Sequence, residues 1–213
     1  MAILLRIPRT PARPDPMRCL PPELVTPPSG DVVSLIDAKR HLRVDHNLDD
    51  DRITLAIQAA VSHLDGYTGI LGRALLAQSW RQFSAYWPAS RCFDLALAPV
   101  AEIISVSARG SGGLVAVPSS SWRLFSGASR PMLMLNRDAQ LPDLDGQADA
   151  VTVTYKAGYG EAAEVPAAIR HAILLMVGDA YRFSETVALG ASSPVPMSIT
   201  VDRMVSPFRR SFV

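Results

Sequence analysis

Side chains that could bind a metal are present, but their spacing matches no metal-binding motif. The chain has four histidines and two cysteines: His41, His46, His63, His171, Cys19 and Cys92. None of the histidines has the HExxH spacing that holds zinc on one face of a helix. Two distant cysteines without a histidine cluster do not complete a tetrahedral zinc site. We expect two unpaired thiols, as is usual inside cells, with a disulfide between them as the alternative.

An acidic stretch at residues 45–51 resembles part of a calcium-binding loop. Its alternate positions carry Asp, Asn and Asp, as the ligands of an EF-hand do. Asp50 stands where that loop needs glycine, however, and Ala56 stands where it needs the bidentate glutamate. Carboxylates also favour the positive N-terminus of a helix. The stretch therefore predicts a helix start, and we expect no metal site in the chain.

A glycine turn, Gly158-Tyr159-Gly160, lies between a predicted strand and a predicted helix, which is where phosphate-binding loops occur. The third glycine of GxGxxG is absent, as is Gly-Lys-Ser/Thr, and no further strand follows to complete a βαβ unit. We interpret the turn as a plain join between sheet and helix. No serine has a GxSxG context, and no motif pairs two carboxylates for acid/base work. We therefore expect no catalytic residue, no cofactor and no enzymatic activity.

The turn belongs to a strand–turn–helix unit at residues 149–184. Val, Val and Tyr alternate with Thr, Thr and Lys before the turn, which is the period-two pattern of a half-buried strand. Pro166 suits the first turn of the following helix, which we expect at 166–183. This helix is apolar almost all round, whereas an ordinary surface helix has one apolar stripe. We expect the rest of its chain and a neighbouring copy to cover it.

The other elements follow from periodicity and from turn residues. Residues 1–33 form a Pro-rich arm that should be extended; it is either a mobile linker or an arm that lies on a neighbouring subunit. Helices are expected at 35–44, where Ser34 and Asp37 form a capping pair, and at 50–68. The β region at 74–156 contains these strand candidates: Leu75–Tyr86, Cys92–Leu97, Ile103–Ala108, Gly113–Val117, Trp122–Phe125, Met132–Leu135 and Ala150–Lys156.

The predicted fold class is therefore α+β. Two N-terminal helices and one long C-terminal helix form a helical core, a small antiparallel β-sandwich is inserted between them, and both chain ends extend as arms. The core domain spans 34–184, and 185–213 is a linker followed by a C-terminal tail. That tail carries three arginines among apolar residues. Because a solvent-exposed tail rarely needs apolar anchors, we favour docking on a partner over fraying.

Composition narrows the class of protein. The 213 residues have a formal net charge of +1, 48% are hydrophobic and 19% are charged. A globular core is expected, and the charge lacks the basic excess typical of a nucleic-acid binder. No apolar run reaches the length of a membrane span, and the N-terminus has no cleavage-site pattern of a signal peptide. These observations indicate a protein that is made and kept in a cytoplasm and has no membrane span; the resemblance described below implies that this is a bacterial cytoplasm.

Several short motifs occur together in one order along the chain. They are Gln78-Ser79-Trp80, Trp87-Pro88, Leu97-Ala98-Pro99-Val100, the run Tyr155-Lys156-Ala157-Gly158-Tyr159-Gly160, Val165-Pro166-Ala167-Ala168-Ile169 and a closing Ser206-Pro207-Phe208-Arg209. In this order they resemble the head–tail connector (adaptor) family of long-tailed bacteriophages and phage-like gene transfer agents, similar to the HK97 connector. The resemblance spans residues 34–210. The arm at 1–30 departs from the usual family member.

The resemblance implies a structural adaptor in the neck of a virion or gene transfer agent particle. Such a protein forms a ring, typically a dodecamer, below the portal and above a tail-completion or stopper protein, and DNA passes through its bore without sequence-specific contacts. It implies that the tail docks on the portal through Met204, Val205, Pro207, Phe208, Arg209 and Arg210. The apolar helices supply the candidate ring interface: Ile57, Val61, Leu64, Ile169, Ile173, Met176 and Val177. Two other classes stay open, a small hydrolase and a nucleic-acid-binding regulator.

Overall fold

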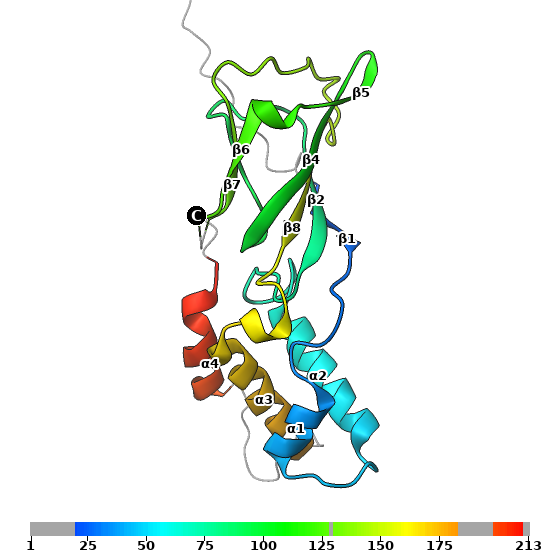
Figure 1. Ribbon diagram of the computed structural model, residues 1–213, viewed down its shortest axis with the longest axis vertical. Helices are drawn as coiled ribbons and strands as arrows, with labels where there is room; N and C mark the ends of the chain where they lie inside the picture. The colour runs from blue at the N-terminus through cyan, green and yellow to red at the C-terminus, as the bar shows by residue number, and fades with distance from the viewer. Residues whose placement is uncertain (1–19, 128–129, 183–197, 211–213) are drawn as a thin grey trace, which may run out of the picture.

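The structure, a computed structural model, describes residues 20–127, 130–182 and 198–210. Its helices gather at one end and its strands at the other, as Figure 1 shows. The described chain starts with one strand, β1 (Glu23–Thr26), then forms two helices at the helical end, builds the remaining strands, and returns to the helical end. The α+β class predicted from the sequence is confirmed.

Two helices lie between β1 and the other strands. Helix α1 (Leu35–Leu42) begins where predicted, because the Ser34 hydroxyl oxygen accepts a hydrogen bond from the Asp37 N–H at 3.1 Å. It ends earlier than predicted, since Arg43 adopts a left-handed conformation with φ 59° and closes the helix through its N–H. Helix α2 (Asp50–Leu64) also ends early, at Asp65, whose backbone is extended.

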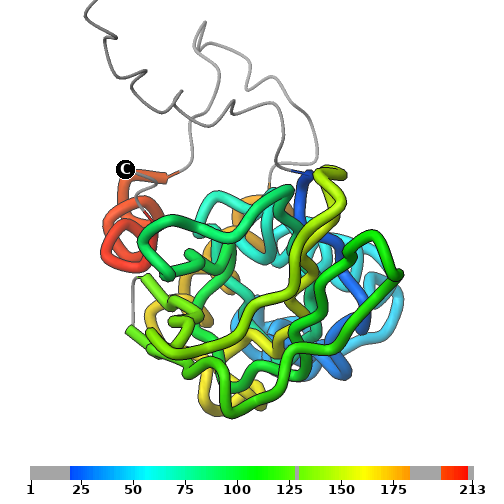
Figure 2. The backbone as a smooth tube through the Cα atoms, turned by 90° about the horizontal axis from the view of Figure 1, so that it is seen from above, coloured from blue at the N-terminus to red at the C-terminus, as the bar shows by residue number. Residues whose placement is uncertain are grey.

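Helix α3 (Ala167–Arg182) packs against α2 and α1 after the strands. Polar contacts fix one end of this pair: the Tyr181 hydroxyl donates to Asp49 Oδ2 at 2.6 Å, and the Arg52 guanidinium lies 4.8 Å from the Tyr181 ring centroid. Helix α4 (Ile199–Val205) then covers another side of α3. α2 and α4 lie at opposite edges of the helical end (Figures 1 and 2).

The larger sheet has five antiparallel strands. It consists of β1 (Glu23–Thr26), β2 (Gln78–Ser84), β8 (Val151–Ala157), β4 (Val100–Gly110) and β5 (Gly113–Ala116), in that spatial order. The predicted alternation of β8 is confirmed, because Val151, Val153 and Tyr155 are fully buried. Tyr155 pairs with Trp80 of β2 on one side and with Ile103 of β4 on the other. β8 is therefore the central strand.

The smaller sheet has three antiparallel strands, in the order β3 (Cys92–Asp94), β7 (Met132–Leu135) and β6 (Trp122–Phe125). Both sheets contribute to one apolar cluster, which includes Phe93 and Leu133 from the smaller sheet and Val106 and Tyr155 from the larger one. A separate apolar cluster fills the helical end. The turn at 158–160 connects the two clusters along the chain.

Part of the N-terminal arm has a structure that the sequence did not predict. Residues 23–26, expected to be a linker or an arm on a neighbour, form the edge strand β1 on β2 of the same chain. Pro22 and Pro27 flank this strand, and prolines are tolerated beside an edge strand because they interrupt no ladder. Residues 1–19 of the predicted arm lie outside the described residues, as do 183–197, which include most of the predicted linker, and 211–213 of the predicted tail.

Candidate functional site

The C-terminal segment, residues 198–210, lies on its own chain. It comprises α4 and a short 3-10 turn, η4 (Ser206–Phe208). Val201 and Val205 of α4 are fully buried in the apolar cluster of the helical end. Met204 and Phe208 pack against the same cluster and are half-buried. The apolar residues that predicted a docking tail are therefore occupied within the subunit.

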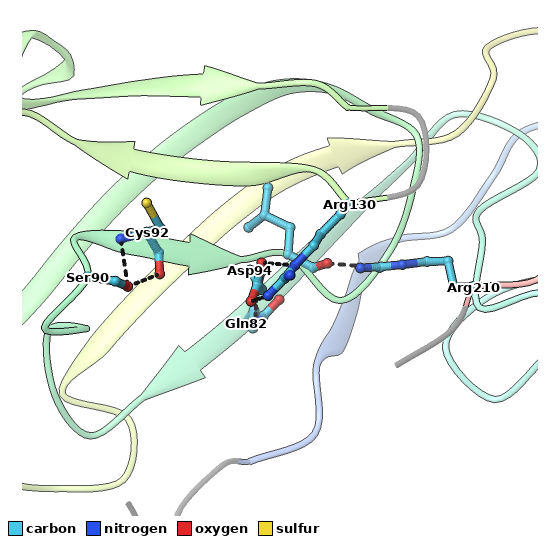
Figure 3. A network of polar contacts seen from close by, with 7 residues as sticks. Gln82, Ser90, Cys92, Asp94, Arg130 and Arg210 are labelled. Carbon is cyan, nitrogen blue, oxygen red and sulfur yellow. Dashed lines mark hydrogen bonds and ion pairs between the residues drawn. The ribbon is translucent and has the colours of Figure 1, made fainter. Parts of the chain in front are cut away.

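Backbone contacts extend this attachment beyond α4. The Arg210 N–H donates to the Leu71 carbonyl oxygen at 3.0 Å, and Arg73 Nε donates to the Phe208 carbonyl oxygen. Leu71 and Arg73 belong to the connection between α2 and β2. The guanidinium of Arg210 reaches further, since its Nη1 donates to the Leu95 carbonyl oxygen at 2.8 Å, as Figure 3 shows. The segment thus joins the helical end to the smaller sheet.

The loop after β3 contains Leu95, which accepts the Arg210 hydrogen bond, and we call it the receiving loop. A polar network holds this loop in place (Figure 3). Arg130 forms two hydrogen bonds with the Asp94 carboxylate, at 2.9 and 2.8 Å. Gln82 of β2 donates to the Asp94 carbonyl oxygen and accepts from the Ala96 N–H. Two-point Arg–carboxylate pairing fixes orientation as well as distance. The carbonyl that meets Arg210 therefore has a defined position.

Electrostatics at this junction reflect burial. Burial lowers the pKa of the Arg210 guanidinium from its ordinary value, and the nearby Tyr155 phenol partly offsets this effect. Burial likewise raises the pKa of the Tyr155 phenol. Both shifts leave each group in its usual state near neutral pH, with Arg210 charged and Tyr155 protonated. A charged arginine donating to a carbonyl makes a stronger bond than a neutral donor does.

The six predicted docking residues differ in what they can present to a partner. Val205 is fully buried, and Met204, Phe208 and Arg210 are half-buried. Only Pro207 and Arg209 are exposed, and Arg209 forms an ion pair of 2.7 Å with Asp202. Their docking role stays a prediction. In this conformation, the exposed pair offers the most surface to a partner, and the half-buried residues offer less.

Most of the predicted ring-interface residues lie in the subunit's own core. Five of the seven are buried in the apolar cluster of the helical end: Ile57, Leu64, Ile169, Ile173 and Val177. Val61 and Met176 are half-buried and keep some exposed surface. The periodic apolar stripes thus face neighbouring helices of the same chain. The interface itself stays a prediction.

Other apolar side chains on the helices are exposed and were not singled out by periodicity. Leu48 is 91% exposed in the loop before α2, and Leu55 is 66% exposed on α2. Ile36 of α1 and Ile199 of α4 are exposed to a similar degree. These residues lie off the buried stripes. An apolar residue at a position outside the buried stripe was the sequence signal that could have identified them as interface candidates.

The glycine turn holds β8, α3 and the segment before β2 together. The Gly158 N–H donates to the Pro99 carbonyl oxygen at 2.9 Å, and the Tyr159 N–H donates to that of Leu75 at 3.1 Å. Gly158 has φ +125°, and a Cβ there would collide with the Leu76 carbonyl. Gly160, at φ +116°, is crowded by the Glu164 carboxylate, which accepts from the Glu161 N–H. The turn therefore needs glycine for backbone reasons.

An apolar groove of about 530 Å³ lies between α2 and the chain around β1. Val61 of α2, Leu24 of β1 and Trp80 of β2 contribute to its walls. Asp65 lies in the groove, where its Oδ1 accepts from the Leu75 N–H at 2.6 Å. Burial raises the pKa of Asp65, and its hydrogen bonds only partly offset that effect. The groove was not predicted, because β1, which forms one of its walls, was not predicted from the sequence.

The polar side chains of the groove form a short chain of hydrogen bonds. Gln78 Nε2 donates to the Asp65 carboxylate at 3.2 Å, and Trp80 Nε1 donates to Gln78 Oε1 at 3.2 Å. Within the described residues, no three His, Cys, Asp or Glu side chains are placed to hold a metal ion. None of the helices described is both long and apolar enough to cross a membrane.

Comparison with known proteins relates this fold to the necks of phage-like particles. Residues 32–85, which contain α1, α2 and β2, match the family model described as phage gp6-like head-tail connector protein. A search of curated proteins found no match. The predicted resemblance to the head–tail connector family is confirmed by this family match.

Solved structures of gene transfer agent (GTA) particles contain chains of similar fold. A chain in the neck of an empty particle, determined with C6 symmetry, gives a TM-score of 0.73 at 22% identity. One in the neck of a native particle, determined with C12 symmetry, gives 0.70 at 21%, and one in the virion of a native particle gives 0.69 at 20%. Each match covers 91% of this chain and 97% of the other. At this identity the likeness establishes the fold.

Proposed function

We propose that this chain, which matches gp6-like head–tail connectors in its first two helices, is a structural adaptor in the neck of a phage or gene transfer agent particle. In this role it forms a ring of twelve copies below the portal, joins the DNA-filled head to the tail, and lets DNA pass through its bore. A tail-completion or stopper protein binds beneath. The chain carries out no catalysis.

One observation carries the proposal: nearly the whole length of the neck chains is matched by nearly the whole of this chain. The match to the C12 neck covers 97% of that chain, so no large functional domain of the neck protein is without a counterpart here. The family match in residues 32–85 supports it independently, because it rests on sequence. The C12 symmetry of that neck supports a ring of twelve copies.

The physical requirements of a ring are compatible with the fold. A closed ring uses a heterologous interface, in which one face of a subunit meets a different face of the next. α2 and α4 lie at opposite edges of the helical end, and both edges carry exposed apolar residues, Leu55 on α2 and Ile199 on α4. We assign ring contacts to these edges together with Val61 and Met176. The buried members of the predicted set support the subunit from within.

The remaining parts take supporting roles in this proposal. The two sheets act as one small β-sandwich that the helical end carries into the ring. A net charge of +1 suits passage of DNA, because a strongly basic bore would retain the phosphates. Docking on the portal uses Pro207 and Arg209, the two exposed members of the predicted docking set.

Deleting the gene tests the function directly. We expect DNA-filled heads without tails in electron micrographs, because the adaptor is needed before a tail can attach. Mass measurement of the purified chain with its portal should give a complex containing twelve copies. Normal tailed particles after deletion would refute the adaptor role.

A point variant tests the docking segment without disturbing the core. Arg209→Glu reverses an exposed charge and should reduce co-purification with the portal, whereas Arg203→Glu, an equally exposed change on α4, should leave it intact. Equal binding by both variants would refute docking through Arg209. Truncation of the whole segment is a poor test, because it also removes the buried Val201 and Val205.

A further inference from the structure

The apolar groove beside α2 has the properties of a peptide-binding site. Its walls come from separate parts of the fold: Leu24 from the edge strand β1, Val61 from α2 and Trp80 from β2. Apolar walls with a few fixed polar groups are typical of sites that take side chains of a ligand. Nothing within residues 20–127, 130–182 and 198–210 fills the groove.

The charge of the groove is one-sided. Among the described residues that line it, two are acidic, Asp31 and Asp65, and none is Lys, Arg or His. The Asp65 carboxylate is fixed in place by Leu75 and Gln78. An occupant that combines apolar side chains with positive charge would therefore complement both properties of the groove.

Of the longer segments outside the described residues, one has this chemistry. Residues 1–19 carry four arginines and one aspartate, and their first part, Ile3-Leu4-Leu5-Arg6-Ile7, combines branched apolar side chains with a cation. Residues 183–197 carry a single charged residue, Glu185, and so offer no cation. Residues 1–19 also precede Pro22 and Leu24, which form one wall of the groove.

We propose that the groove binds residues 3–7 of a second copy of this chain, so that each subunit's arm docks on its neighbour. The apolar side chains fill the space between Val61 and Trp80, and Arg6 lies near Asp31 and Asp65. Twelve residues separate Ile7 from Leu20, and four of them are prolines. A Pro-rich stretch of this length spans about 37 Å, which favours reach to an adjoining subunit over a tight return to the same groove.

This inference rests on the proposed ring, because the ring places a second groove within reach of each arm. The inference goes beyond the proposed ring, because it names the segment and the groove that join one subunit to the next. Exchange of arms around a ring links every subunit to the next by a segment outside the packed helices. Such a link resists opening of the ring even where the helix-to-helix contact is small.

A photo-cross-linking experiment on the full-length chain tests the contact. Leu5 is replaced by p-benzoylphenylalanine, the chain is irradiated at concentrations up to about 1 mM, where even weak association is populated, and the products are separated on a denaturing gel. We expect covalent dimers and higher multimers, with the cross-linked peptide mapping by mass spectrometry to α2 or to Trp80. A cross-linked product of monomer mass would show that the arm occupies its own groove, and would overturn the second-copy assignment. So would a chain that yields no dimer at this concentration.

Two variants of adjacent residues separate groove binding from general association. Gln58 lines the groove and Ala59 does not, and both are exposed on α2. Gln58→Arg adds a charge that repels the arm and should lower the dimer yield about threefold or more, in the range of an exposed charge pair. Ala59→Arg should leave the yield unchanged. Equal yields from the two variants, or cross-links outside the groove, would overturn the proposal.

The cross-linking test of arm exchange and the gene-deletion test of the adaptor role can fail independently of each other. Tailless particles after gene deletion together with no cross-link in the groove would retain the adaptor and reject the arm exchange. Cross-linked multimers together with normal tails after deletion would retain the arm exchange and reject the adaptor.

Discussion

The seating of α4 on its own subunit can be tested by replacing Val205 with alanine. Val205 is 0% exposed within the apolar cluster of the helical end, so the substitution removes two buried methyl groups. Each buried methyl-sized group contributes about 0.8 kcal/mol, which gives about 1.6 kcal/mol for the pair. A residual cavity adds up to about 1 kcal/mol, and the higher helix propensity of alanine returns about 0.5 kcal/mol. The expected loss is therefore about 1–2 kcal/mol.

Urea unfolding followed by tryptophan fluorescence measures this loss as a lower midpoint at unchanged slope. Arg203→Ala provides the control, because Arg203 is exposed on the same helix and its removal should change stability by less than about 0.5 kcal/mol. A cost below about 0.5 kcal/mol for Val205→Ala would refute the reasoning. It would mean that α4 is unseated in solution and that its apolar face is available to a partner.

Further predictions concern the turn, the groove and the receiving loop. Gly158→Ala should destabilise by more than about 2 kcal/mol because of positive φ and backbone collision, whereas Gly112→Ala, with open space around it, should change stability by less than about 0.5 kcal/mol in the same urea assay. Because burial raises the pKa of Asp65, the folded state favours its protonated form; the free energy of unfolding should therefore fall as pH rises from 3.8 through the raised value, and Asp65→Asn should remove that part of the slope. An identical slope in both proteins would contradict this. Arg130→Ala should lower the urea midpoint only slightly, since its pair with Asp94 is exposed, and that decrease should shrink in high salt.

Local signals in the sequence predicted much of the fold. The Ser34 cap, the strands at 122–125 and 132–135, and the alternation of β8 were all predicted where the structure has them. These features depend only on residues close in sequence. The cap needs a hydroxyl three positions before the backbone N–H that it accepts from, and the strand needs apolar residues at every second position. The helix ends were less accurate, because the left-handed Arg43 and the extended Asp65 have no distinctive residue type.

Features that depend on distant partners were not predicted. β1 is a four-residue strand whose existence depends on pairing with β2, more than fifty residues away in the sequence. An apolar stripe shows that a helix is covered, but the covering surface can belong to the same chain or to another. For α3, the residues Ile169, Ile173 and Val177 turned out to meet the subunit's own helices. The seating of α4 was missed for the same reason.

The position of α3 and α4 has a consequence for how the chain folds during synthesis. α1 and α2 are complete by residue 64, but the helix that covers them begins at residue 167. Closing a loop of about a hundred residues costs conformational entropy before any contact repays it, and such long-range contacts slow folding. All strands of the two sheets, in contrast, are translated before α3, so their pairing needs no segment that is made later. We therefore expect the sheets to acquire structure on the ribosome first. The apolar faces of α1 and α2 stay exposed until α3 and α4 have been synthesised and can pack on them.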